Sequence, residues 1–173
     1  MCYMTILSTT ADADLSAHNN ELVTFSAVMP AIPEERYLAH PFKWFIGSRD
    51  GCSCALRHLY VSSCELGFGE PEEWYPEEAE DIEATRQIAA TIRALVHGGA
   101  QVDCVDAWAQ GQEGAAPLAG ELTVKLSEVG DASFRFFEMH RFVLSNELVG
   151  RMLVGISGLL RWPQKIIRTM QLH

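Results

Sequence analysis

Two cysteines one residue apart, Cys52 and Cys54, lie shortly before His58 in the sequence. Thiolates and imidazoles are the ligands that soft metal ions prefer, and a thiolate is also a nucleophile. The pattern therefore predicts one of two kinds of chemistry. The first is a metal site, for zinc or another soft ion, built from Cys52, Cys54, His58 and Cys104. The second is a thiol enzyme with Cys52, Cys54 and His58 as catalytic residues, assisted by Cys64 or Cys104.

The expected local geometry sets a condition on the metal site. Alternate residues on a strand lie on one face but about 6.6 Å apart, whereas two sulfurs on a tetrahedral zinc ion are about 4 Å apart. The chain would therefore have to bend between Cys52 and Cys54. The alternative is that both are small, buried, apolar residues of a core strand, which is how free cysteines usually behave.

The acidic residues are concentrated in one stretch that also contains aromatic side chains. Residues 65–83 hold nine acidic residues and no basic one, with Trp74 and Tyr75 in the middle of the stretch. One interpretation is a carboxylate-lined pocket or a divalent-cation site with an aromatic wall, although the close spacing around a central glycine that calcium loops use is missing. The alternative is that many of these acids face water at the start of a helix, where they complement its dipole.

Other polar residues fall near predicted strands and are further candidates for a pocket. Asp106 would share a strand face with Cys104 and Trp108. Glu138 and His140 would form an acid–base pair if they lie on a strand, because residues two apart share a face. In each case the alternative is an ordinary solvated polar face. The pocket candidates are Arg57, Trp74, Asp106, Glu138 and His140.

The elements that must position these residues follow from hydrophobic spacing. Apolar residues recur at helical intervals after Pro76 and end before Gly98, which predicts a long amphipathic helix over about residues 77–97. Strands are predicted over residues 2–8, 42–47, 100–108 and 121–126. Residues 48–51 resemble a hairpin turn, with 52–61 as the returning strand. For residues 127–144 helix and strand compete, and a short helix followed by a strand is favoured.

This order of elements predicts an α+β fold with a mainly antiparallel sheet, because strands and helix do not alternate regularly. Residues 1–146 are expected to form one globular domain. Residues 147–173 are expected to form a basic amphipathic segment with an apolar helix. Its apolar stretch, residues 148–160, is shorter than the roughly 20 residues that span a bilayer. This segment is predicted to pair with a second copy or with its own domain, with peripheral membrane contact of residues 148–168 as another interpretation.

Composition and motifs narrow the class of protein. The chain has 173 residues and a formal net charge of -10, and no basic cluster precedes residue 147, which argues against nucleic-acid binding. The first basic residue is Arg36, so a secretory signal is not indicated, and five cysteines favour free thiols in the cytoplasm. The chain carries no nucleophile elbow, phosphate loop, dinucleotide fingerprint or zinc-protease motif.

The function expected from the sequence is therefore binding rather than a recognisable catalytic class. We expect a cytoplasmic binding or accessory protein that self-associates through its C-terminal helix and takes a small molecule or a protein partner. The alternative is a thiol-dependent or metal-dependent enzyme centred on the Cys-Ser-Cys turn. No cofactor is required by the sequence, and zinc or another soft metal is the candidate ion.

Overall fold

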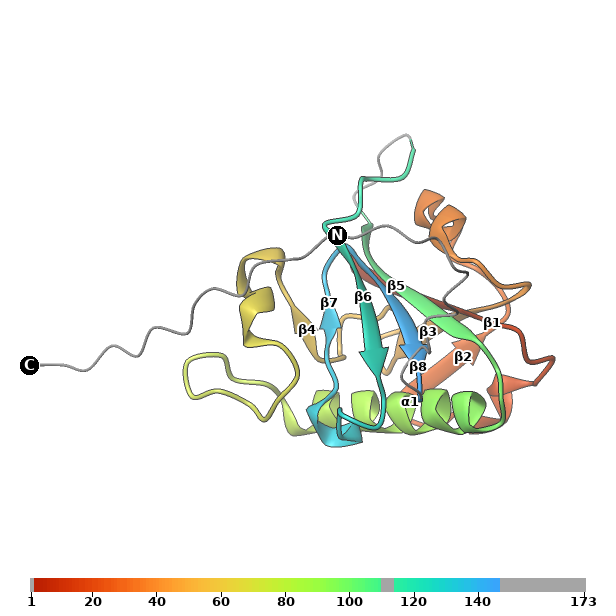
Figure 1. The fold of residues 1–173 in the computed structure, drawn as a ribbon. Helices are drawn as coiled ribbons and strands as arrows, with labels where there is room; N and C mark the ends of the chain where they lie inside the picture. The colour runs from red at the N-terminus through yellow and green to blue at the C-terminus, as the bar shows by residue number, and fades with distance from the viewer. Residues whose placement is uncertain (1, 110–113, 147–173) are drawn as a thin grey trace, which may run out of the picture.

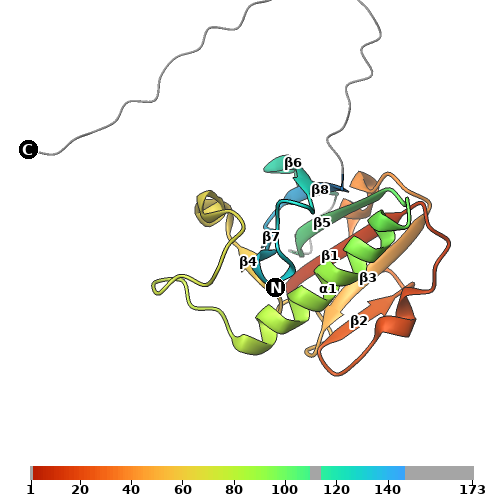
Figure 2. The same cartoon turned by 60° about the horizontal axis from the view of Figure 1, so that its bottom comes forward.

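The computed structural model describes residues 2–109 and 114–146. One helix, α1, lies on one face of a six-stranded sheet, below the sheet in Figure 1 and in front of it in Figure 2. The strands of this sheet are β1 (Cys2–Thr9), β2 (Val23–Ser26), β3 (Phe42–Ser48), β5 (Val102–Ala109), β6 (Gly120–Lys125) and β8 (His140–Ser145). The helix α1 spans Ala79–His97, and a small second sheet joins β4 (His58–Leu59) to β7 (Phe136–Phe137).

The strand order of the large sheet is β2-β3-β1-β5-β8-β6. Every neighbouring pair is antiparallel except β6 and β8, which are parallel, and β4 and β7 in the small sheet are also parallel. The predicted α+β fold with a mainly antiparallel sheet and one long helix is therefore confirmed. β1 is central, and its Thr5 pairs with Ile46 on one side and with Asp106 on the other.

The helix packs because its apolar residues fall on one side. Ala84, Ile88, Ala89 and Ile92 are buried against apolar side chains of the sheet, and burying each isoleucine contributes about 1.5–3 kcal/mol. The predicted range of 77–97 is two residues too long at its start. After the helix ends, Gly99 adopts a φ of 88°, a left-handed conformation that glycine takes without steric cost.

The opposite face of the sheet is covered by a short segment rather than by a second long helix. Residues around the 3₁₀ turn η2 (Pro33–Tyr37) pack there against Ile6, Val105 and Ala107. The centre of the sheet is therefore buried on both faces, which explains why β1 and β5 carry apolar residues at successive positions rather than a strict polar alternation.

The turn of the predicted hairpin forms, but the prediction of a returning strand over residues 52–61 is wrong. The turn itself forms, because the Gly51 N–H donates to the Ser48 carbonyl at 2.9 Å. The chain then runs irregularly from Cys52 to Arg57 instead of pairing with β3. Both edges of β3 are already occupied, by β1 and β2, so no ladder is left for a returning strand.

The last described part matches the favoured assignment only in part, because its helical portion is a 3₁₀ turn of 3 residues. The C-terminal segment lies outside the described residues. Residues 131–133 form a 3₁₀ turn, η4 (Asp131–Ser133), which precedes β7 and β8, as a short helix followed by a strand. The apolar helix predicted within 147–173 falls outside the described residues, so self-association through it stays a prediction. Within residues 2–109 and 114–146, no helix is long and apolar enough to cross a membrane.

A buried group of two arginines and one glutamate fixes the segment before α1. Arg57 and Arg135 are each 1% exposed, and both donate to the Glu77 carboxylate, with N–O distances of 2.7–3.2 Å. Their other N–H groups donate to backbone carbonyls, including those of Gly69 at 2.8 Å and Glu70 at 2.7 Å. The residue 67–77 loop, yellow-green in Figure 1, is therefore tied to the domain by charge-assisted hydrogen bonds.

We expect Glu77→Gln to destabilise the protein by about 3 kcal/mol, because it removes the carboxylate that compensates two buried guanidinium groups. Urea denaturation of the full chain measures this change. Glu128→Gln is the matched control, because Glu128 pairs with Lys125 at 3.0 Å but its side chain is 66% exposed; a change below about 1 kcal/mol is expected there. Equal effects of the two substitutions would contradict the structural role of Glu77.

Candidate functional site

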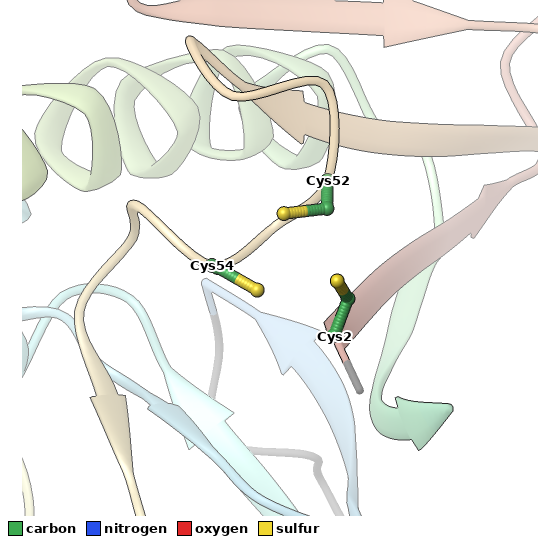
Figure 3. A group of neighbouring side chains, drawn as sticks. All are labelled: Cys2, Cys52 and Cys54. Atoms are coloured by element: carbon green, nitrogen blue, oxygen red, sulfur yellow. The ribbon is translucent and has the colours of Figure 1, made fainter. Parts of the chain in front are cut away.

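Three cysteines from two separate parts of the chain converge at one end of β1. Cys2 begins β1, whereas Cys52 and Cys54 lie in the irregular stretch after β3. Their sulfur atoms all lie within 4.8 Å of one another, and Figure 3 shows the three side chains pointing toward a common space. Cys2 and Cys52 are half-buried and Cys54 is exposed. This is a group of thiols that an external ion can reach.

The bend between Cys52 and Cys54 is produced by the buried serine between them. The Ser53 N–H donates to the Tyr3 carbonyl at 3.0 Å, and its hydroxyl donates to the Ile46 carbonyl at 2.6 Å. The same hydroxyl accepts the Thr5 N–H at 2.7 Å. Because Ser53 is held between β1 and β3 in this way, the cysteines on either side of it are brought beside the start of β1.

The structure brings together a different set from the one predicted. Cys52 and Cys54 join Cys2, and neither His58 nor Cys104 belongs to the group. Cys104 is fully buried in the core between the sheet and α1. The alternative that Cys52 and Cys54 are buried residues of a core strand is wrong, because both are accessible and neither lies in a strand.

Three of the cysteine thiols have a pKa above the ordinary value. Partial shielding of its sulfur from water, with a further contribution from the neighbouring Cys52 thiol, raises the pKa of Cys54 to about 12, although the Tyr3 N–H donates to this sulfur at 3.3 Å. Burial also raises the pKa of Cys64 and, more strongly, of Cys104. These three side chains are therefore protonated thiols at neutral pH, unlike the thiolates of lowered pKa that serve as nucleophiles.

His58 belongs to a buried ion pair, and it is neither placed as a ligand with the thiols nor free to act as a base. Its Nδ1 lies 2.7 Å from a carboxylate oxygen of Asp106, and its Nε2 lies 2.6 Å from the Ser53 carbonyl. A carbonyl oxygen only accepts, so Nε2 carries a proton, and the Thr5 hydroxyl donates to the other oxygen of Asp106 at 2.9 Å. Burial acts to lower the pKa of His58, but the Asp106 carboxylate outweighs it and the pKa is raised. The ring stacks on Tyr3 with centroids 4.1 Å apart.

Two of the predicted pocket residues, Arg57 and Trp74, line a cavity of about 330 Å³ that Cys54 also lines. Asp106 is buried beside this cavity, in its pair with His58. Glu138 and His140 are not among the lining residues.

Glu138 and His140 do not form the predicted acid–base pair in the structure. The Glu138 carboxylate accepts the Val61 N–H at 3.0 Å, and His140 Nδ1 donates to the Glu138 carbonyl at 2.8 Å. The two residues are separated by a turn in which Met139 has a φ of 56°, rather than lying together on one strand. The strand geometry on which the acid–base hypothesis depended is therefore missing.

The residues that sequence reasoning missed are Cys2 and Tyr3. Both stand at the start of the first strand, where local spacing gives no indication of a site. They meet Cys54 and His58 across about fifty residues of sequence, through the pairing and packing of β1. Comparison with protein-family models, with curated proteins and with solved structures found no match for the chain.

The His58–Asp106 pair predicts a specific dependence of stability on pH. Because the folded pKa of His58 is raised above its ordinary value of 6.5, the stabilisation is fully present below about pH 6.5 and is lost as the pH rises through the folded pKa. The difference in unfolding free energy between the native chain and His58→Gln should be about 3 kcal/mol at low pH and should shrink as the pH rises.

Denaturant unfolding at a series of pH values from about 5.5 to 9 measures this difference, over the range in which histidine titrates. His97→Gln is the control, because His97 is exposed at the end of α1 and its replacement should leave the pH dependence of the native chain in place. A native-to-variant difference that is constant with pH would contradict a charged His58.

Proposed function

We propose that the protein binds a thiophilic metal ion, with zinc as the reference case, through Cys2, Cys52 and Cys54. The observation that carries this proposal is the convergence of three sulfur atoms, from two distant segments, within 4.8 Å of one another. Zinc–sulfur bonds are about 2.3 Å long, which places sulfurs about 4 Å apart on a tetrahedral ion. Only small side-chain rotations would be needed to reach that spacing.

The set of ligands leaves one coordination position open. Within the described part of the chain, no histidine, aspartate or glutamate joins the three thiols. Closed structural zinc sites use four protein ligands, whereas sites with three protein ligands keep a position for water or for an external ligand. The proposed site is therefore one in which a bound ion stays available to a second molecule, which suits a binding or accessory protein.

The thiol enzyme is less well supported than the metal site. A nucleophilic cysteine needs a lowered pKa or an adjacent general base, and burial raises the pKa of Cys54. The neighbouring imidazole, His58, already uses both ring nitrogens on Asp106 and Ser53. It therefore has no nitrogen free to take a proton from a thiol.

The reduced full chain should bind one zinc ion, and each of Cys2→Ser, Cys52→Ser and Cys54→Ser should weaken binding at least tenfold, as expected for loss of one thiolate ligand. Metal analysis after dialysis gives the stoichiometry, and cobalt substitution gives thiolate-to-metal charge-transfer absorption. Cys64→Ser is the matched control, because Cys64 lies outside the group and its thiol donates to the Tyr60 carbonyl. Full retention of metal by all three cluster variants would overturn the proposal.

Zinc affinity should rise with pH, because the thiols must lose their protons to become ligands. The raised pKa of Cys54, about 12, makes proton release the dominant source of this dependence. Calorimetric titrations at one pH in two buffers of different ionisation enthalpy count the protons released, and a value of two to three per zinc ion is expected for ligation by initially protonated thiols. Release of no protons would contradict ligation by the three cysteines.

A further inference from the structure

The cavity beside the thiol group has several aromatic side chains in its wall. It measures about 330 Å³, near the lower end for small-molecule sites. The aromatic side chains that line it are Tyr3, Tyr60, Trp74 and Tyr75. The Tyr75 hydroxyl donates to the His58 carbonyl at 2.9 Å, and the rings of Tyr60 and Trp74 meet the Tyr75 ring edge-on, with centroids 6.4 and 5.8 Å away. These rings therefore form a fixed wall rather than a loose apolar patch.

Two of these rings are open to solvent, and a third ring is buried and carries a hydroxyl without a hydrogen-bond partner in the described part of the chain. Trp74 is 64% exposed and Tyr60 is 53% exposed, which is unusual for large hydrophobic side chains. Tyr3 is only 6% exposed, and its hydroxyl has no hydrogen-bond partner within residues 2–109 and 114–146. An unpaired buried hydroxyl costs about 1–3 kcal/mol, and a ligand in the cavity would supply the missing partner.

The positive groups that line the cavity are already held in buried ion pairs. Arg57 pairs with Glu77 at 2.7 Å, and the side chain of this arginine is fully buried. His58 pairs with Asp106 at 2.7 Å. Neither cation is therefore free to hold an anionic ligand.

The carboxylates around the cavity are in excess. Asp81 lines it and lies 3.2 Å from Arg49. Glu78 also lines it, and Glu72 and Glu73 directly precede Trp74 in the sequence. No basic residue in the described ranges pairs with the side chains of Glu72, Glu73 or Glu78. The site thus combines aromatic faces with uncompensated negative charge.

We propose that this cavity binds a small organic cation that carries an ammonium group. A cation over the face of an aromatic ring is attracted by the ring quadrupole, and aromatic walls with nearby carboxylates are the usual recognition site for quaternary ammonium ligands. This second site uses groups other than the metal-binding thiols, although Cys54 touches both. The proposal is therefore independent of the metal site and stands or falls separately.

Choline and its uncharged isostere 3,3-dimethylbutan-1-ol are the probes, because they share shape and hydroxyl and differ in charge. The reduced full chain is titrated in the presence of a chelator, and the tryptophan indole N–H signals are followed by NMR. Choline should shift the Trp74 signal in a saturable manner, and the isostere should bind about 5- to 30-fold more weakly. Equal binding of the two probes, or a shift confined to other tryptophans, would overturn the proposal.

Variants locate the site and separate binding from folding. Trp74→Leu should weaken choline binding about 5- to 30-fold, and Glu78→Gln should weaken it about 2- to 5-fold, as expected for an exposed ion pair. Glu128→Gln is the matched control and should have no effect. Tyr3→Phe should weaken choline binding about 5-fold without lowering the melting temperature, since it removes only an unpaired hydroxyl.

Two further outcomes are decisive. Cys52→Ser should weaken the proposed metal binding at least tenfold and keep choline binding, because Cys52 belongs to the thiol group and does not line the cavity. This variant separates the failure of one proposal from the failure of the other. A lysine-containing tripeptide is titrated alongside choline. If the tripeptide binds at this site and choline does not, the occupant is a protein side chain, and the proposal of a small organic cation is wrong.

Discussion

Arg57 and Arg135 both pair with one carboxylate, that of Glu77. The part of the molecule that carries the candidate cavity depends on this constraint. Two guanidinium groups that are almost fully buried are tolerated only with a compensating charge and a complete set of acceptors. The acceptors are Glu77 and the carbonyls of residues 67–70 and 132–134. The loop before α1 must therefore fold back over β4 and β7, and this places Trp74 and Tyr75 as a cavity wall.

A second network fixes the opposite wall and the thiol group together. Ser53 joins β1 to β3 through its hydroxyl, and its carbonyl accepts a hydrogen bond from His58, which is paired with Asp106 on β5. The same serine turns its neighbouring cysteines toward the start of β1, and the same histidine stacks on Tyr3. The proposed metal site and the proposed cation site thus share one rigid support, while the groups that would bind each ligand stay distinct.

Local patterns predicted the parts of this fold that depend on local forces. The helix over about 77–97 was predictable, because Ile88 and Ile92 recur at the spacing of one helical face and both are buried. The central strands were predictable from their β-forming residues. The returning strand after Gly51 was not, because its failure to form depends on β1 and β2 occupying both edges of β3. The residues of the turn do not indicate which distant strands will occupy those edges.

The sequence by itself determined the ingredients of the candidate sites, which are the paired cysteines and the acidic aromatic stretch. It also argued against nucleic-acid binding, because no basic cluster precedes residue 147. Only the tertiary structure decided which of these residues contact one another. It placed Cys2 beside Cys54, assigned both nitrogens of His58 to oxygen acceptors, and left the hydroxyl of the cavity-lining Tyr3 without a partner among the described residues. The physical reason is that these contacts join segments about fifty residues apart, whose proximity is set by strand pairing and burial, and local spacing carries no information about either.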